Sequence, residues 1–238
     1  MAEKPKTPKP PVKVQAPKSR PGGGPVGGGG GGRTKLFLGV GGGLIVIVVI
    51  VVVLVLASSS SGGSPVKKIT AAMDKVGCTV TTVPATKSAL HVQSLDAKIT
   101  YNSFPPTSGY HYQSPALWGN YSDVVNPRQA VHNEEHGGMI IWYEDIPASE
   151  RAEITAFYDE SPNGVLVTPI VDSTAGLTYP KHASLKGKVA TTAWDSDIGK
   201  GVVATCPKFD KTAFEAFRKT FRGHGPERFP ISSMLPGQ

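Results

Sequence analysis

An uninterrupted apolar run, Leu36–Ala57, is the feature that most limits what this chain of 238 residues can fold into. Its 22 residues include no charged or strongly polar side chain. At about 1.5 Å per residue a helix of this length covers about 33 Å, enough for a hydrocarbon core of about 30 Å. The β-branched residues would favour a strand in water, but a single segment in lipid satisfies its backbone polar groups only as a helix. We therefore expect one transmembrane helix over residues 36–57.

The positive charge of the chain is concentrated before this run. Eight of the 25 Lys and Arg residues precede residue 36, against the single acid Glu3, so this segment carries the whole net charge of +7. Arg33 and Lys35 stand directly before the run, and the next cations are Lys67 and Lys68. The positive-inside rule then predicts a cytoplasmic N-terminus and an extracytoplasmic C-terminal part, at the cell membrane. Because the remaining residues balance in charge, a basic nucleic-acid-binding domain is not expected.

The segments on either side of the run lack the apolar residues that a core needs. Residues 1–35 are rich in Pro, Lys and Gly and predict a disordered tail, and residues 58–65 (SSSSGGSP) predict a flexible linker. A cleaved signal peptide is the alternative to an anchor, since small residues follow at Ala57 and Ser59. A preceding region of more than 30 residues is too long for that interpretation. Both interpretations export residues 66–238, which we expect to form a single domain.

This exported part has two cysteines, Cys78 and Cys206, near its two ends. An even pair in an exported domain predicts a disulfide, with two buried free thiols as the alternative.

Short helical and strand patterns alternate along the exported part without a regular βαβ rhythm, which predicts an α+β fold. Asn126-Pro127 is a typical helix start and Gly137-Gly138 a typical end. Residues 102–126, rich in Pro, Gly, Ser and Tyr, are expected to form a long ordered loop. Helices are expected over residues 66–75, 126–137, 147–158 and 210–221, and strands over 80–83, 91–92, 98–101, 139–143, 164–170, 189–194 and 202–205.

Histidines provide the clearest indication of chemistry. His132 and His136 are separated by four residues on one expected helix, a spacing at which two imidazoles can bind one ion. His111 lies on a Pro-braced loop and His91 in a short strand. Neutral imidazole suits zinc or copper. We expect a metal site built from His111, His132 and His136, with His91 as a further ligand and Glu135 orienting one ring. The alternative is a hydrogen-bonded structural pair.

Several sequence blocks occur in a distinctive order, namely PPTSGYHY (Pro105–Tyr112), Pro115–Tyr121, VHNEEHGGMIIWY (Val131–Tyr143), Thr192–Trp194 and Gly225–Arg228. Over about residues 77–229 this order resembles a bacterial family known as domain of unknown function 3105. The resemblance implies a membrane-anchored exported domain and places all five candidate ligands on signature positions. The family pattern has Leu where this chain has Glu134, and Gly where it has Asp195. The family name implies no activity.

Three classes of function fit these residues, and the sequence leaves open whether the protein is an enzyme. The first is an anchored domain that binds copper or zinc, with Met139 as an optional soft ligand if it does not lie in the core. The second is a metal-dependent hydrolase, because HNEEH matches the H-x-x-E-H pattern in which two histidines hold zinc and the Glu polarises water. The third is a metal-free interaction module at the cell surface or cell wall, in which aromatic side chains bind the partner. The alternative is that these rings pack the loop of residues 102–126 on its own domain. They are Tyr101, Phe104, Tyr110, Tyr112, Trp118 and Tyr121.

Overall fold

The computed structural model describes residues 64–86, 90–180 and 183–238. The expected tail, the expected membrane span and most of the expected linker, residues 58–63, lie outside the described residues. Within the described ranges, no helix has both the length and the apolar character needed to cross a membrane.

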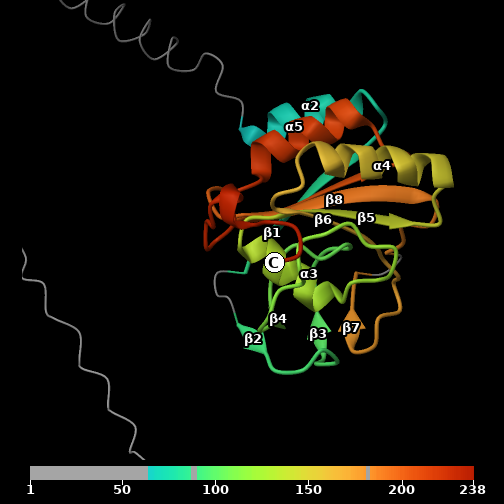
Figure 1. Cartoon of the computed structure of the whole chain (residues 1–238). Coiled ribbons are helices and arrows are strands. Elements are labelled where there is room, and N and C mark those ends of the chain that lie inside the picture. Colours follow the sequence, from blue (N-terminus) through green and yellow to red (C-terminus); the bar gives the residue numbers. More distant parts are fainter. Residues whose placement is uncertain (1–63, 87–89, 181–182) are drawn as a thin grey trace, which may run out of the picture. The chain divides into compact units, whose positions relative to one another are not determined.

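A five-stranded sheet lies at the centre of the domain (Figure 1). Its order is β1-β9-β8-β5-β6, in which β5 and β6 run parallel and the other neighbours antiparallel. The domain thus mixes helices with a largely antiparallel sheet, consistent with the α+β class predicted from the sequence. The strands are β1 (Thr79–Pro84), β5 (Met139–Glu144), β6 (Val165–Pro169), β8 (Lys188–Asp195) and β9 (Lys200–Cys206).

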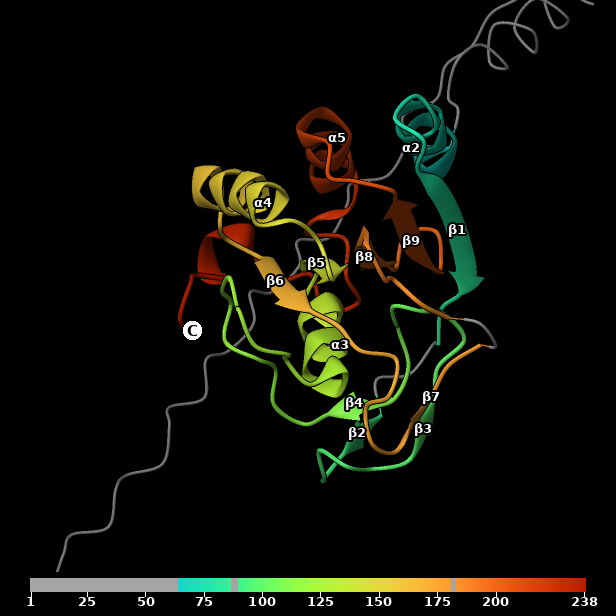
Figure 2. The same ribbon diagram turned by 90° about the vertical axis from the view of Figure 1, so that its right-hand side faces the viewer.

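Helices cover both faces of this sheet, because side chains along a strand point alternately to opposite sides. On β5, Met139 and Ile141 join one apolar cluster, while Ile140 and Trp142 join another. One group of helices covers the first face, and α3 (Pro127–Glu135) covers the second (Figures 1 and 2). The group includes α2 (Pro65–Asp74), α4 (Ala148–Glu160) and α5 (Lys211–Phe221).

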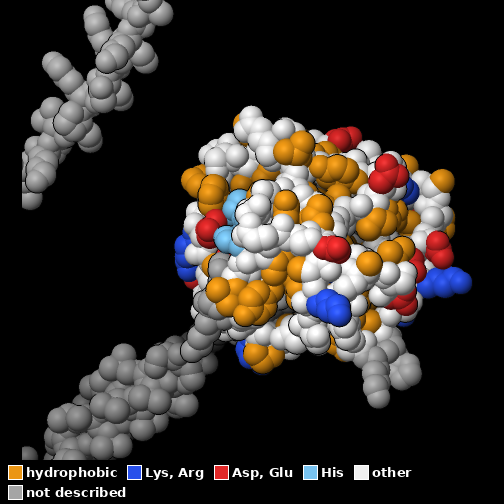
Figure 3. All heavy atoms as spheres, turned by 90° about the horizontal axis from the view of Figure 1, so that it is seen from below, with side chains coloured by type: hydrophobic (Ala, Val, Ile, Leu, Met, Phe, Trp, Pro, Cys, Tyr) orange, Lys and Arg blue, Asp and Glu red, His pale blue; other side chains and the backbone are white. Residues whose placement is uncertain are grey.

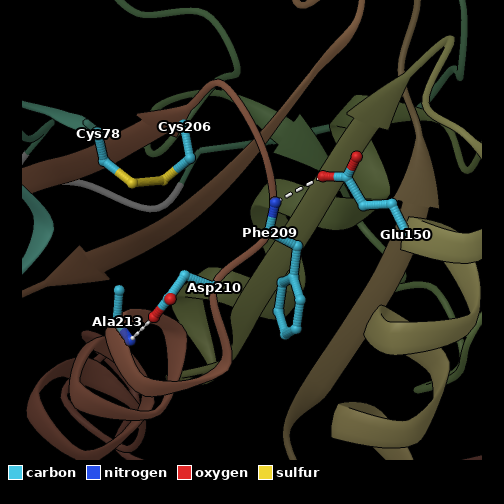
Figure 4. Close-up of a disulfide and its surroundings, with 6 residues drawn as sticks. All are labelled: Cys78, Glu150, Cys206, Phe209, Asp210 and Ala213. Atoms are coloured by element: carbon cyan, nitrogen blue, oxygen red, sulfur yellow. Dashed lines mark hydrogen bonds between the residues drawn. A yellow bond between two sulfur atoms is a disulfide. The ribbon is translucent and has the colours of Figure 1, made fainter. Parts of the chain in front are cut away.

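Cys78 and Cys206 form the predicted disulfide, with sulfur atoms 2.03 Å apart (Figure 4). The bond joins the residue before β1 to the last residue of β9, across a sequence separation of 128 residues. The chain then turns into α5, where Asp210 accepts a hydrogen bond from the amide of Ala213 at 2.8 Å and caps the helix (Figure 4).

Two small parallel ladders lie beyond α3, on the side away from the main sheet (Figures 1 and 2). β2 (His91–Val92) pairs with β4 (His111–Tyr112), and β3 (Ile99–Thr100) pairs with β7 (Leu177–Thr178). The expectation that residues 102–126 contain no strand is therefore wrong, since β4 lies within them. A strand of two residues is too short to produce an alternating pattern. Of the three strands β2, β4 and β7, each two residues long, only β2 was expected.

α3 begins as its sequence predicts and ends two residues earlier than expected. Asn126 accepts a hydrogen bond from the amide of Arg128 at 3.1 Å, and Pro127 occupies the first turn. Gly137 follows the helix with φ +100°, a conformation that favours glycine. The amide of Gly223 donates to the Gly137 carbonyl at 2.7 Å, so the segment after α5 packs against the end of α3.

Candidate metal centre

Three chain segments bring four of the five predicted ligands together. The β2–β4 ladder places His91 directly opposite His111. α3 contributes His132 and Glu135, which stand one turn apart on the same face. In this group each residue offers one ligand atom, and the four atoms lie within 4.8 Å of one another.

The carboxylate of Glu135 lies at the centre of the group. Its Oε2 is 2.9 Å from His111 Nε2, 3.7 Å from His91 Nε2 and 3.9 Å from His132 Nε2. In a tetrahedral site with bonds of about 2.0–2.1 Å, ligand atoms stand roughly 3.3 Å apart. The observed separations lie on both sides of this value, so the group has the dimensions of a site for a first-row metal ion.

Two carbonyl oxygens determine which nitrogen of the buried rings faces Glu135. His111 Nδ1 donates to the carbonyl of Gly109 at 2.8 Å, and His132 Nδ1 donates to the carbonyl of Tyr112 at 2.7 Å. Because a carbonyl oxygen only accepts hydrogen bonds, the proton of each neutral ring lies on Nδ1. The lone pair of each Nε2 is then free to bind a cation, and the carbonyl fixes the ring's orientation.

The central atoms lack hydrogen-bond partners. Among the described residues, His111 Nε2 and both oxygens of Glu135 are buried and accept or donate no hydrogen bond. His111 Nε2 and Glu135 Oε2 lie 2.9 Å apart, and with the His111 proton on Nδ1 neither atom has a proton to donate to the other. Leaving a buried polar group unpaired costs about 1–3 kcal/mol. A cation between these atoms would satisfy all of them, which is the arrangement expected of a metal site.

The protonation states of the group also suit a metal. Burial lowers the pKa of His132 to about 4, and the neighbouring His111 and His136 act in the same direction. Burial alone would raise the pKa of Glu135, but the adjacent His111 and then His132 and His91 lower it overall. At neutral pH His132 is therefore neutral and Glu135 ionised, the forms in which these side chains bind metals.

His136 is not brought into this group. Its Nε2 lies 3.1 Å from Glu227 Oε2, and its ring stacks on Phe229 with centroids 4.3 Å apart. Its ring still contacts that of His132, at 4.6 Å between centroids. The helical spacing still holds at His136, whose amide donates to the His132 carbonyl at 3.2 Å, but its Nε2 is directed to Glu227 instead of the group. The His132–His136 pair expected from the sequence is replaced by His132 and Glu135.

Three contributors to the site were not predicted from the sequence. The carbonyls of Gly109 and Tyr112 carry no sequence signal, because any residue offers a carbonyl. Glu227, the partner of His136, does lie in the Gly225–Arg228 block, so a signal for it was present.

The six aromatic residues between positions 101 and 121 mostly pack on their own domain. Tyr101 and Trp118 are 3% and 5% exposed, whereas Tyr110 is 48% exposed. Phe104, Tyr112 and Tyr121 are half-buried. Packing therefore accounts for most of these rings.

A second group of ionisable side chains, Asp195, Asp197 and His224, already forms hydrogen bonds and ion pairs with neighbouring residues. Asp195 is buried and accepts hydrogen bonds from the amides of Asp197 and Ile198. Asp197 contacts His224 at 2.6 Å and also pairs with Arg228. The guanidinium of Arg228 would repel a cation, so the group serves as an ion-pair network.

The comparisons with known proteins identify a family but no activity. The family model described as "Protein of unknown function (DUF3105)" matches residues 91–231, more than half of the chain. The matched range contains the four grouped residues, His91, His111, His132 and Glu135, as well as His136 and Glu227. Neither a curated protein nor a solved structure matches the chain. The chain therefore belongs to the DUF3105 family.

Proposed function

We propose that this protein is a membrane-anchored, extracytoplasmic metal-binding module that holds one zinc or copper ion. The ligands are His91, His111, His132 and Glu135. The observation that carries the proposal is the convergence of three Nε2 atoms on one buried carboxylate whose oxygens have no hydrogen-bond partner among the described residues.

The ligand set supports zinc or divalent copper. Imidazole nitrogens with one carboxylate oxygen suit these ions, whereas calcium and magnesium prefer oxygen ligands throughout. Cuprous copper favours sulfur, and the group includes none. Met139, an optional soft ligand in the sequence, is fully buried in the apolar cluster beneath α4 and α5, and both cysteines are bonded to each other.

The location outside the membrane rests on the sequence and agrees with the cysteines. The run over residues 36–57 supplies the span, and the charges before it supply the orientation. A disulfide is typical of an exported domain, because cytosolic thiols are kept reduced. These two observations support residues 66–238 as an extracytoplasmic domain.

The geometry does not favour the peptidase interpretation of HNEEH. That pattern requires His132 and His136 as ligands and the Glu as a base for water. Here His136 pairs with Glu227, and Glu135 lies among the ligand atoms. Holding a metal is the function that this arrangement supports best.

The proposal is tested by metal content. The full-length chain is purified in mild detergent without reductant, stripped with a chelator, reloaded with zinc or copper in separate samples, desalted and measured by elemental analysis. We expect close to one ion per chain for one of these metals. The double variant His111→Ala/Glu135→Ala should lose that ion, while His224→Ala, which removes an exposed histidine outside the group, should keep it. Equal metal content in both variants would overturn the proposal.

A further inference from the structure

The four ligands differ sharply in their access to solvent. The side chains of His111 and Glu135 are 0% exposed and that of His132 is 7% exposed, whereas that of His91 is 38% exposed. An ion that enters or leaves the group must move from solvent to the ligand atoms or back. Among the four ligands, His91 has by far the most exposed side chain. Figure 3 shows that histidine side chains reach the surface in the view from below.

The segment that carries His91 is held weakly. From Leu90 to Asp96 every residue is exposed except Val92, which is half-buried. β2 is joined to β4 by a ladder of only two residue pairs, and a hydrogen bond from the amide of His111 to the Leu90 carbonyl at 3.3 Å lies at its edge. Past β2, the segment is also held by the Asn126 side-chain amide, which donates to the Leu95 carbonyl at 3.0 Å. Segments with little buried apolar surface and exposed hydrogen bonds open most readily.

The segments that carry the other ligands are firmly anchored. Asn133 on α3 exchanges two hydrogen bonds with the backbone of Ala116, at 2.9 and 3.0 Å. Arg128 on the same helix is fully buried and donates to the carbonyl of Ala175 at 2.8 Å. α3 also packs against β4, β5 and β8. His132 and Glu135 therefore lie on a firmly anchored helix, and His111 lies on β4, which packs against that helix in addition to pairing with β2.

Given the metal site proposed above, we propose that β2 is the gate of that site and that His91 is the last ligand to bind the ion and the first to release it. Ion exchange then requires that Leu90–Asp96 move away from β4, which breaks the short β2–β4 ladder and the hydrogen bond from the Asn126 side chain to the Leu95 carbonyl. The other three ligands hold the ion while this segment is open, and His91 closes the coordination sphere when the segment docks. His91 thus sets the rate of ion release more than the capacity to bind.

Zinc release tests this order of binding. Zinc-loaded full-length protein is mixed in a stopped-flow instrument with excess chromophoric chelator, and the rate of zinc transfer is recorded. We expect His91→Ala to keep one zinc per chain but to release it about 10- to 100-fold faster than the unmodified protein, since affinity changes lie mostly in dissociation rates. His111→Ala should fail to retain zinc, and His224→Ala should release it at the unmodified rate.

Release from His91→Ala at the unmodified rate, or loss of zinc from it as complete as from His111→Ala, would overturn the gate. If the unmodified protein itself retains no zinc, the metal site fails and the gate with it, an outcome that elemental analysis separates from failure of the gate alone.

Hydrogen exchange measures the opening directly. With zinc bound, amides in residues 90–96 should exchange more slowly than in the stripped protein, while those of α3 should change little. Equal exchange of residues 90–96 with and without zinc would contradict the gate even where zinc is bound.

Discussion

Replacing Glu134 by leucine should make the protein more stable. Glu134 is 0% exposed, and both of its carboxyl oxygens lack a hydrogen-bond partner among the described residues. Burial raises its pKa well above the usual value of 4.5, and the nearby Thr192 hydroxyl opposes this rise only in part. Leaving a buried polar group unpaired costs about 1–3 kcal/mol, so Glu134→Leu should raise the free energy of unfolding by about that amount. Leucine is also the residue that the family pattern places here.

The sign of the pH dependence follows from the raised pKa. Above about pH 4.5 the carboxyl ionises in the unfolded chain but stays protonated in the folded one, so stability falls as the pH rises toward the folded pKa. The stabilisation by Glu134→Leu should therefore be larger at about pH 7.5 than at about pH 5. Glu134→Gln is the matched control, because it removes the titration and keeps an unpaired polar group.

Urea unfolding of the three proteins with chelator present, followed by tryptophan fluorescence, measures these differences. In thermal unfolding each kcal/mol should shift the midpoint by about 2–4 °C for a domain of this size. A Glu134→Leu variant less stable than the original protein at about pH 7.5 would refute the reasoning, because it would mean that the carboxyl makes a favourable interaction.

Three further predictions concern Gly225, the pKa of His132 and the disulfide. Gly225→Ala would place a Cβ atom 2.5 Å from the carbonyl oxygen of Glu135. We therefore expect this variant to be less stable and to bind zinc more weakly, as measured by competition with a chelator. Unchanged zinc affinity would mean that this contact does not position Glu135. Because burial lowers the pKa of His132 to about 4, its ring signals in NMR spectra of the stripped protein should not titrate between about pH 5.5 and 8, and a midpoint near the usual 6.5 would contradict its burial. Replacing Cys78 and Cys206 by alanine should lower stability by about 4–5 kcal/mol on the chain-entropy account, and a loss below about 1 kcal/mol in urea unfolding would show that the crosslink constrains little.

The sequence predicts the elements of this domain better than their arrangement. α3 is predicted because Asn126, Pro127 and Gly137 are strong local signals at its ends. The strands of the main sheet are long enough for their apolar runs to identify them. Their order, and the parallel pairing of β5 with β6, depend on contacts between distant segments that no local pattern records.

For the candidate site, too, the sequence identifies the residues better than their arrangement. Spacing along the helix indicates that His132 and its neighbours share a face, but it does not show that the side chain of His136 pairs with Glu227 instead of joining the group. Glu135 was among the candidate metal residues, in the role of orienting a ring, and its carboxylate lies among the ligand atoms. The approach of His91 to His111 depends on a ladder of two residue pairs, which is too short to be recognised from sequence.

X-ray absorption spectroscopy at the zinc edge tests the central claim most directly. In the zinc-loaded full-length protein we predict a shell of about four nitrogen and oxygen neighbours at about 2.0–2.1 Å, with the multiple-scattering signature of three imidazole rings and no sulfur. A shell of oxygen atoms without imidazole scattering, or one that includes sulfur, would contradict the convergence of His91, His111, His132 and Glu135 on a single ion.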